Sequence, residues 1–162
     1  MEKRIMVDMS ATLIHHGHIR LLQKAADCGT VVVGLTSDDE IFAKKGYQPE
    51  LSFNHRKEVL ESIKYVSEVV STPWLIDEKI LEKYQIDLLV HGDDNSNLIV
   101  DAKVKVFSRT QGVSSTDIRQ KAQRAITQIN NQKLMLTPGP AVVLHENLEY
   151  LKPIFGRGDD EY

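Results

Sequence analysis

The chain has 162 residues, of which 41% are hydrophobic and 27% charged, a balance that excludes a disordered or fibrous protein. This length fits one domain of ordinary size with about thirty residues to spare. Cys28 is the single cysteine, which excludes an intramolecular disulfide and a cysteine zinc cluster. The net charge of −3 argues against a nucleic-acid-binding surface. Because no long apolar segment or signal peptide is present, we expect a cytoplasmic protein without a membrane partner.

Short β-branched segments alternate with helical patterns from residue 3 to about residue 130, which predicts an α/β fold with a parallel sheet flanked by helices. The predicted strands cover residues 4–7, 30–35, 66–70, 87–91 and 103–107. Helices are predicted near residues 19–26, 59–63, 77–84 and 114–130, the last with a capping-box spacing of Ser114 and Asp117. We expect a surface loop in the polar segment that contains Lys44, Lys45, Gly46 and Pro49. Residues 1–130 would form the domain, and residues 131–162 a linker or tail.

The first concentration of chemistry is His15-His16-Gly17-His18, between the first strand and the first helix. Ligands of open α/β sheets bind beyond the carboxyl ends of strands, where a helix N-terminus attracts an anion. Gly17 permits close approach, while His15 and His18 can donate hydrogen bonds or carry positive charge toward a phosphate. Two other interpretations stay open: a three-histidine metal site, and histidines without a function in a loop.

The second concentration is residues 109–116, which again follow a strand and lead into a helix. Arg109 offers a planar fork for a phosphate, and Gly112 permits a tight turn. Ser114, Ser115 and Thr116 place hydroxyl groups and backbone N–H groups where an anion would bind. Ordinary helix capping explains these three residues equally well when the segment is taken alone.

The two segments together carry a family resemblance. Ile14-His15-His16-Gly17-His18 resembles the His-x-Gly-His signature of the nucleotidylyltransferase superfamily, and residues 109–116 resemble its Arg-Thr-x-Gly-Ile-Ser-Thr-Thr signature. The Arg-Thr form is similar to that of the glycerol-3-phosphate, phosphocholine and phosphoethanolamine cytidylyltransferases. Residues 54–69 resemble the central helix and strand of that family, and residues 91–94 its nucleotide-side loop. The resemblance implies a Rossmann-like domain, usually a homodimer, that transfers CMP from CTP with Mg²⁺ to a small phosphorylated alcohol and releases pyrophosphate.

The resemblance also implies roles for individual residues. His15 and His18 would contact the CTP phosphates and stabilise the transition state, and Lys44, or its neighbour Lys45, would bridge CTP and the acceptor phosphate. Catalytic roles fall to His15, His18, Lys44 and Arg109. Contacts to the nucleotide are expected from Ser10, Gly17, His91, Gly92, Asp94, Arg109, Thr110, Gly112, Val113, Ser114, Ser115 and Thr116. Contacts to the acceptor are expected from Lys44, Lys45, Arg56 and Lys64. No residue is expected to hold a metal of its own, and Mg²⁺ would arrive with CTP.

Departures from the family pattern concern the acceptor. Met9-Ser10-Ala11-Thr12 stands where the family has Gly-Thr-Phe-Asp, and Lys64 and Ser67 stand where relatives tend to have arginine and aspartate. In the tail, residues 134–140 and 156–162 resemble the start of class V pyridoxal-phosphate aminotransferases, the group that contains 2-aminoethylphosphonate transaminase. This tail would then be the start of a truncated aminotransferase domain in a longer fused protein; the alternative is a disordered extension.

The sequence therefore predicts a cytidylyltransferase that acts on a small phosphonate, 2-aminoethyl- or 2-hydroxyethylphosphonate, or on a phosphomonoester. A phosphocholine, phosphoethanolamine or glycerol-3-phosphate cytidylyltransferase is the first alternative. An adenylyltransferase of the same superfamily is the second, because the same motifs serve ATP. A regulatory module that binds a nucleotide without catalysis is the third, since the Gly-Thr-Phe-Asp segment is missing.

Overall fold

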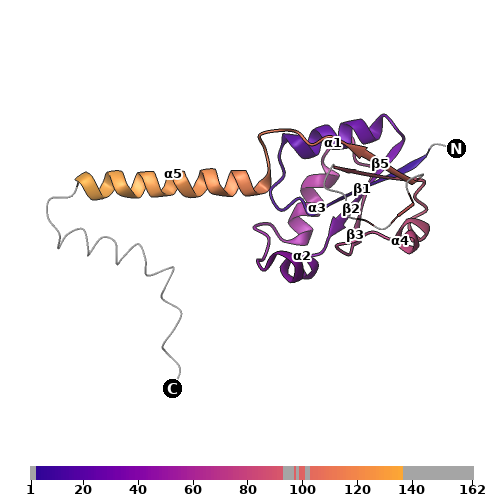
Figure 1. The fold of residues 1–162 in the computed structure, drawn as a ribbon, viewed down its shortest axis with the longest axis horizontal. Helices are drawn as coiled ribbons and strands as arrows, with labels where there is room; N and C mark the ends of the chain where they lie inside the picture. Colours follow the sequence, from indigo (N-terminus) through magenta and orange to yellow (C-terminus); the bar gives the residue numbers. More distant parts are fainter. Residues whose placement is uncertain (1–2, 93–96, 98, 101–102, 137–162) are drawn as a thin grey trace, which may run out of the picture. The chain divides into compact units, whose positions relative to one another are not determined.

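The computed structural model describes residues 3–92, 97, 99–100 and 103–136 (Figure 1). The strands are β1 (Arg4–Met9), β2 (Thr30–Thr36), β3 (Glu68–Thr72), β4 (Leu88–Gly92) and β5 (Val104–Phe107). The helices are α1 (His16–Ala26), α2 (Asp38–Lys45), α3 (Phe53–Glu61), α4 (Glu78–Lys83) and α5 (Ser115–Leu136). The chain forms two compact units that divide between Ile118 and Arg119.

All five strands belong to one parallel sheet in the order β3-β2-β1-β4-β5. Val7 of β1 lies opposite Val33 of β2 on one side and Val90 of β4 on the other. The chain thus starts in the middle of the sheet, builds β2 and β3 outward, and then returns to add β4 and β5 on the other side of β1. This arrangement confirms the predicted Rossmann-like α/β fold.

Apolar side chains of β1 alternate between the two faces of the sheet, as the period of a strand requires. Ile5 and Val7 pack on one face with Leu22 of α1 and Leu60 of α3. Met6 packs in a second cluster with Leu81 of α4 and with neighbours in β2 and β4. Helices therefore cover both faces of the sheet, which leaves the ends of the strands as the place for polar side chains.

Helix α2 corrects one prediction, because part of the segment expected to be a loop is helical. Ser37 caps its start by accepting a hydrogen bond from the backbone N–H of Glu40, and Gly46 ends it in a left-handed conformation. Acidic residues lie in its first turn and Lys44 and Lys45 in its last, as the helix dipole favours. Ile41 is its one buried residue, so the apolar periodicity that reveals most helices is weak here.

Helix α5 starts where the sequence predicts it and extends beyond the expected end near residue 130 to Leu136. The Ser114 hydroxyl accepts a hydrogen bond from the backbone N–H of Asp117 and donates one to its carboxylate, at 3.0 and 2.7 Å. None of the described helices is long and apolar enough to cross a membrane. Most of the aminotransferase-like tail, from residue 137 onward, lies outside the described residues.

Candidate active site

A cleft of about 350 Å³ opens at the carboxyl ends of the strands. It is lined by residues that end or follow β1 and β4, the two neighbouring strands between which the chain order reverses. Helices leave adjacent strands in opposite directions at such a reversal, so a crevice forms there and binds the ligand in open α/β sheets. Two strand-to-helix turns, residues 15–18 and 109–116, contribute to the lining; they are called the paired turns below.

The first of the paired turns is held by two reciprocal hydrogen bonds. His15 caps α1: its Nδ1 accepts from the backbone N–H of Gly17 at 3.1 Å. His18 returns the bond, because its Nδ1 accepts from the backbone N–H of His15 at 3.2 Å. A ring nitrogen that accepts carries no proton, so the proton of each neutral imidazole is assigned to Nε2. The rings lie against each other with centroids 3.9 Å apart.

Both histidines are uncharged at neutral pH. Burial, reinforced by the neighbouring His15, Arg109 and Lys45, lowers the pKa of His18 to about 3. Burial also lowers the pKa of His15, and the neighbouring His16 and Arg109 act in the same direction. Each ring therefore offers a neutral Nε2–H donor. Of the two phosphate-binding modes open to these histidines from the sequence, hydrogen-bond donation fits this environment and positive charge does not.

The second of the paired turns is attached directly to the first. The Ser115 hydroxyl donates a hydrogen bond to the Leu13 carbonyl oxygen, at 3.1 Å, across 102 residues of sequence. Val113 closes on Gly17, where an added Cβ would lie 3.3 Å from Val113 Cγ1 and 2.9 Å from His15 Nδ1. Gly112 has a φ of +75°, the left-handed conformation that glycine adopts without strain. Gly17 and Gly112 thus let two backbone turns meet at the cleft.

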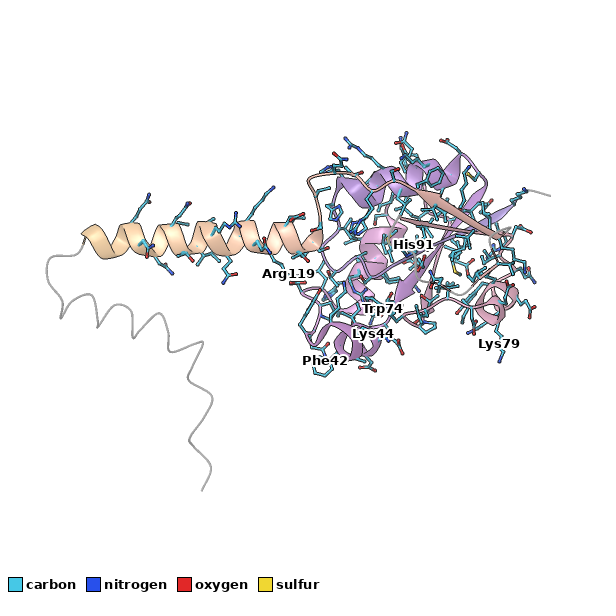
Figure 2. The ribbon with its side chains drawn as sticks, in the orientation of Figure 1. Phe42, Lys44, Trp74, Lys79, His91 and Arg119 are labelled. Carbon is cyan, nitrogen blue, oxygen red and sulfur yellow. The ribbon has the colours of Figure 1, made fainter. Side chains whose placement is uncertain are left out.

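A second part of the lining comes from residues that end or follow the strands or lie on α2, here called the strand-end group. Its members are Asp8, Ser10, Lys45, Trp74, His91 and Asn97. Lys45 Nζ lies 3.4 Å from Ser10 Oγ, to which it donates, and 5.4 Å from the centroid of the Trp74 ring. Figure 2 labels Trp74 and His91 of this group.

Asp8 is the carboxylate of the strand-end group, and its side chain is only 10% exposed. Its Oδ2 accepts from the Asn97 side chain at 3.1 Å and lies 3.3 Å from His91 Nε2. Asn97 also accepts, through Oδ1, from the backbone N–H of Ile76. Among the described residues nothing donates to Asp8 Oδ1, although this atom is buried. A buried carboxylate oxygen without a donor is unfavourable, so a ligand that brings a donor or a cation would be favoured beside it.

Charge in the cleft differs from charge in the whole chain. The chain is acidic overall, with a net charge of −3, whereas four cationic side chains and the single carboxylate of Asp8 line the described cleft. The cations are Arg20, Lys24, Lys45 and Arg109. Such a lining attracts a polyanion, because a low-dielectric cleft concentrates the field of its charges.

The cleft brings together most of the residues that the sequence singled out. Those that line it are Ser10, His15, Gly17, His18, Lys45, His91, Gly92, Arg109, Thr110, Val113, Ser114, Ser115 and Thr116. Asp94 lies outside the described residues. Gly112 shapes the turn without lining the cleft.

Three of the expected acceptor contacts lie elsewhere. Lys44 is exposed on α2 (Figure 2), and its neighbour Lys45 lines the cleft in its place. Lys64 is exposed, with Nζ 4.9 Å from the centroid of the Tyr65 ring. Arg56 is completely buried, and its guanidinium donates to carbonyl groups and to Asp38. In these positions the three side chains do not face the cleft.

Several lining residues escaped the sequence reasoning, among them Asp8, Arg20, Lys24, Thr36, Trp74, Asn97 and Phe107. For Asp8 a signal was available: a carboxylate near the carboxyl end of the first strand of an α/β fold is well placed for a ligand. Trp74, the single tryptophan of the chain, follows β3 and could have been marked on the same ground. Within the part of the chain that the structure describes, no group of three or more His, Cys, Asp or Glu side chains is arranged to hold a metal ion.

Comparison with known proteins gives a consistent result. Residues 10–121 match the cytidylyltransferase-like family. The ethanolamine-phosphate cytidylyltransferase of Arabidopsis thaliana is 38% identical over 131 residues, which cover 71% of this chain and 31% of that protein. The glycerol-3-phosphate cytidylyltransferase of Bacillus subtilis is 33% identical over 124 residues, which cover 74% of this chain and 96% of that protein. The chain therefore spans about a third of the first relative and nearly all of the second.

A solved structure supports the fold. The lipopolysaccharide core biosynthesis protein from Thermoplasma volcanium superposes with a TM-score of 0.58 at 18% identity. The match covers 68% of this chain and all of that one. At this identity the likeness concerns the architecture, a parallel sheet with helices on both faces, and says nothing about substrates.

Proposed function

The chain belongs to the cytidylyltransferase-like family, and on this basis we propose that it transfers the CMP group of CTP to a small acceptor that carries a phosphate or a phosphonate. An acceptor oxygen attacks the α-phosphorus of CTP and forms a new P–O bond. The bond between the α-phosphorus and the oxygen that bridges to the β-phosphorus breaks, and its electron pair leaves with pyrophosphate. The acceptor is already an anion, so the reaction needs positioning and charge stabilisation more than a general base.

The observation that carries this proposal is the meeting of the paired turns at one cleft. Each turn starts a helix there, so two positive dipole ends face the same cavity. The Ser115 to Leu13 hydrogen bond and the close contact of Gly17 with Val113 hold the turns together. A triphosphate carries enough anionic oxygens to accept hydrogen bonds from both turns at once.

His15 and His18 supply neutral donors to this site. Their Nε2–H groups would bond to the phosphate oxygens on which negative charge increases in the transition state. A preorganised donor of this kind is worth roughly 3 kcal/mol of activation free energy. Neutral rings suit the site better than two more cations, because Arg109 and Lys45 already place positive charge beside His18.

Magnesium fits the site as an ion that arrives with the nucleotide. Mg²⁺ in nucleotide sites takes most of its ligands from phosphate oxygens and water, with one or two carboxylates from the protein. Among the described residues no group of three or more His, Cys, Asp or Glu side chains is arranged to hold a metal ion, so phosphate oxygens and water would supply most of the ligands of this ion. When bound, the ion would neutralise charge on the leaving pyrophosphate, while Arg109 and Lys45 contribute positive charge from the chain itself.

The acceptor end of the proposal is a phosphonate, with an aminoethyl group favoured over a hydroxyethyl group. Met9, Ser10 and Ala11, which replace the family's Gly-Thr-Phe, line the cleft, so these three departures fall in the cavity that an acceptor would have to enter, whereas Lys64 and Ser67 do not line it. A primary ammonium would supply a donor to Asp8 Oδ1, which has none among the described residues. The aminotransferase-like tail supports the phosphonate, and the named relatives support a phosphate ester such as phosphoethanolamine. Both acceptors present similar anionic oxygens and an ammonium at the end of a two-carbon chain, which is joined to phosphorus directly in the phosphonate and through an oxygen in the phosphate ester.

A grid of nucleotides and acceptors tests the proposal. Pyrophosphate release is measured with Mg²⁺ and CTP, ATP, GTP or UTP against 2-aminoethylphosphonate, 2-hydroxyethylphosphonate, phosphoethanolamine, phosphocholine and glycerol 3-phosphate. We expect release with CTP and the aminated acceptors, and the highest kcat/KM with 2-aminoethylphosphonate. Release that requires ATP would establish the adenylyltransferase alternative. Binding of CTP without release from any acceptor would establish the regulatory module.

The Asp8→Asn variant tests the ammonium contact separately. A neutral amide lacks the charge that attracts an ammonium, so we expect kcat/KM for 2-aminoethylphosphonate to fall about 30-fold, in line with a charge-assisted hydrogen bond worth roughly 2 kcal/mol. 2-Hydroxyethylphosphonate carries no ammonium and should lose less than about threefold by the same reasoning. Equal losses for both acceptors would show that Asp8 does not recognise the amine.

A further inference from the structure

Arg56 on α3 is the largest completely buried side chain of the described protein. Arginine is rarely buried, because removing its charge from water is expensive unless every donor finds a partner. Nε donates to the Leu51 carbonyl at 3.1 Å, and Nη2 donates to the Asp38 carboxylate at 2.6 Å. Nη1 donates to the Ser10 carbonyl, and Nη2 also donates to the Thr36 carbonyl. A leucine would fill such a position without the cost of removing a charge from water. We therefore attribute the arginine at this position to the hydrogen bonds that it donates.

The partners of Arg56 share a location. Ser10 follows β1 and Thr36 ends β2, and both residues line the cleft. Carbonyl groups beyond the end of a parallel strand have left the sheet ladder and need other donors. The planar guanidinium reaches both at once and so fixes the ends of two adjacent strands relative to each other.

Arg56 also acts on the helix that carries Lys45. Asp38, its ion-pair partner, is the first residue of α2, and Lys45 is the last. The other carboxylate oxygen of Asp38 accepts from the backbone N–H of Phe53 at the start of α3, which ties α2 to α3. Arg56 therefore holds the helix that carries Lys45. It also holds Ser10 through its carbonyl group, and the Ser10 hydroxyl lies 3.4 Å from Lys45 Nζ.

We propose that Arg56 is a positioning residue for Lys45: by binding Ser10, Thr36 and Asp38 together, it directs the Lys45 ammonium into the cleft beside Trp74. The role of Lys45 in binding the acceptor rests on the proposed function. The dependence of the Lys45 position on Arg56 does not rest on it.

A double-mutant cycle on activity is the first test. Arg56→Lys keeps the charge beside Asp38 but replaces a planar fork by one ammonium group, which cannot serve the Ser10 and Thr36 carbonyls together. In the wild-type background we expect a roughly tenfold loss in kcat/KM, mainly through a higher acceptor KM, as for other residues coupled through direct contacts. In a Lys45→Ala background the same substitution should change kcat/KM by less than about twofold. Equal losses in both backgrounds would overturn the proposal.

Trp74 provides a readout that does not depend on activity. It is the single tryptophan of the chain, and the Lys45 ammonium lies 5.4 Å from its ring centroid, so its fluorescence reports on that ammonium. Arg56→Lys and Lys45→Ala should each shift the emission maximum, and Arg56→Lys should produce no further shift when Lys45 is already absent. An unchanged spectrum in Arg56→Lys, or an additional shift in the double variant, would overturn the proposal even if the wild type released no pyrophosphate. Inactivity of the wild type would instead overturn the proposed function.

Two further variants separate positioning from loss of stability. Leu60→Ala removes another completely buried side chain of α3, one turn after Arg56, that carries no hydrogen-bond donor. It should lower the thermal unfolding temperature and leave both the acceptor KM and the Trp74 emission unchanged. If Arg56→Lys fails to fold, Ser10→Ala removes the hydroxyl that Lys45 contacts while the Ser10 carbonyl remains available to Arg56. Ser10→Ala should shift the Trp74 emission and raise the acceptor KM, and no change in either would overturn the proposal.

Discussion

The two parts of the cleft lining are held in place by different kinds of contact. Within the paired turns most hydrogen bonds join residues two or three positions apart, such as those between His15, Gly17 and His18. In the strand-end group the partners are remote in sequence: Lys45 bonds to Ser10 across 35 residues, and Asn97 bonds to Asp8 across 89. The first part is a local motif, while the second exists only when the sheet has formed.

Under the proposed function, this difference indicates that the paired turns bind the nucleotide phosphates and the strand-end group binds the acceptor. A local motif can be kept intact while the rest of the cleft varies, which suits groups that serve the invariant triphosphate. Long-range contacts depend on how β1, α2 and the segments after β3 and β4 pack together, which suits groups that distinguish acceptors. Substitutions in the two parts should therefore have distinct kinetic effects, and the following variants measure that distinction.

The largest effect is expected from His18→Ala in the paired turns. The substitution removes an Nε2–H donor and the Nδ1 acceptor that holds His15, and a transition-state donor is worth on the order of 3 kcal/mol, so kcat should fall at least 100-fold. Pyrophosphate release under saturating CTP measures the loss, and circular dichroism checks the fold. His16→Ala is the matched control, because His16 is exposed and does not line the cleft. Comparable losses in both variants would remove His18 from the mechanism.

In the strand-end group, Lys45→Ala should have the next largest effect. Under the proposed function, the loss of one ammonium beside an anionic acceptor costs roughly 2 kcal/mol, or about 30-fold in kcat/KM, and we expect most of it in the acceptor KM. Lys44→Ala removes the same charge from the same helical turn, but from a side chain that does not line the cleft. It should stay within about twofold, since this side chain, unlike Lys45, does not line the cleft. A larger effect at Lys44 than at Lys45 would reverse the assignment of the two lysines.

Sequence reasoning succeeded where contacts are local. The parallel sheet, the positions of its five strands and both paired turns were predictable, because apolar periodicity and capping patterns act over a few residues. The choice between Lys44 and Lys45 was not predictable, because it requires the existence and rotation of α2, whose single buried residue gives a weak signal. Asn97 could not be identified, since its partners Asp8 and Ile76 meet it only in the folded sheet.

The buried position of Arg56 is indicated by the spacing of apolar residues in the sequence. It lies four residues before Leu60 and seven before Ile63, so the helical period places it on the apolar face of α3. An arginine on a buried face indicates carbonyl or carboxylate partners inside the protein more than a ligand outside it. The family resemblance implied an acceptor contact for Arg56, whereas its position in the helical repeat indicated the buried site that the structure has.

The neutral histidines of the paired turns predict a dependence of stability on pH. The pKa of His18 is lowered from the ordinary 6.5 to about 3, so between these values the unfolded chain binds a proton that the folded chain does not. Acidification from pH 6.5 toward 3 therefore favours unfolding, and His18 alone contributes a slope of up to about 1.4 kcal/mol per pH unit. Above pH 6.5 its contribution is constant. Urea unfolding from pH 4.5 to 7.5 measures how the free energy of unfolding changes with pH. This slope should be shallower in His18→Gln than in the wild type, and it should be unchanged in His55→Gln, the control at an exposed histidine. Identical slopes in all three proteins would contradict the assigned neutral state.

The smallest effect is expected where the local motif depends on one long-range bond. Ser115→Ala removes the hydroxyl that ties the second of the paired turns to the Leu13 carbonyl, and a neutral hydrogen bond contributes about 1 kcal/mol, so kcat/KM for CTP should fall about fivefold. Thr127→Ala removes a similar hydroxyl-to-carbonyl bond from the same helix, to Gln123, at a residue that does not line the cleft, and should leave kcat/KM unchanged. Ser115 connects the two turns and, among the described residues, its hydroxyl does not bond to the strand-end group. Its loss should therefore raise the KM for CTP, and the KM for the acceptor should not change. An equal rise in both KM values would mean that the two parts of the cleft are coupled through Ser115, and the division between them would then fail at this residue.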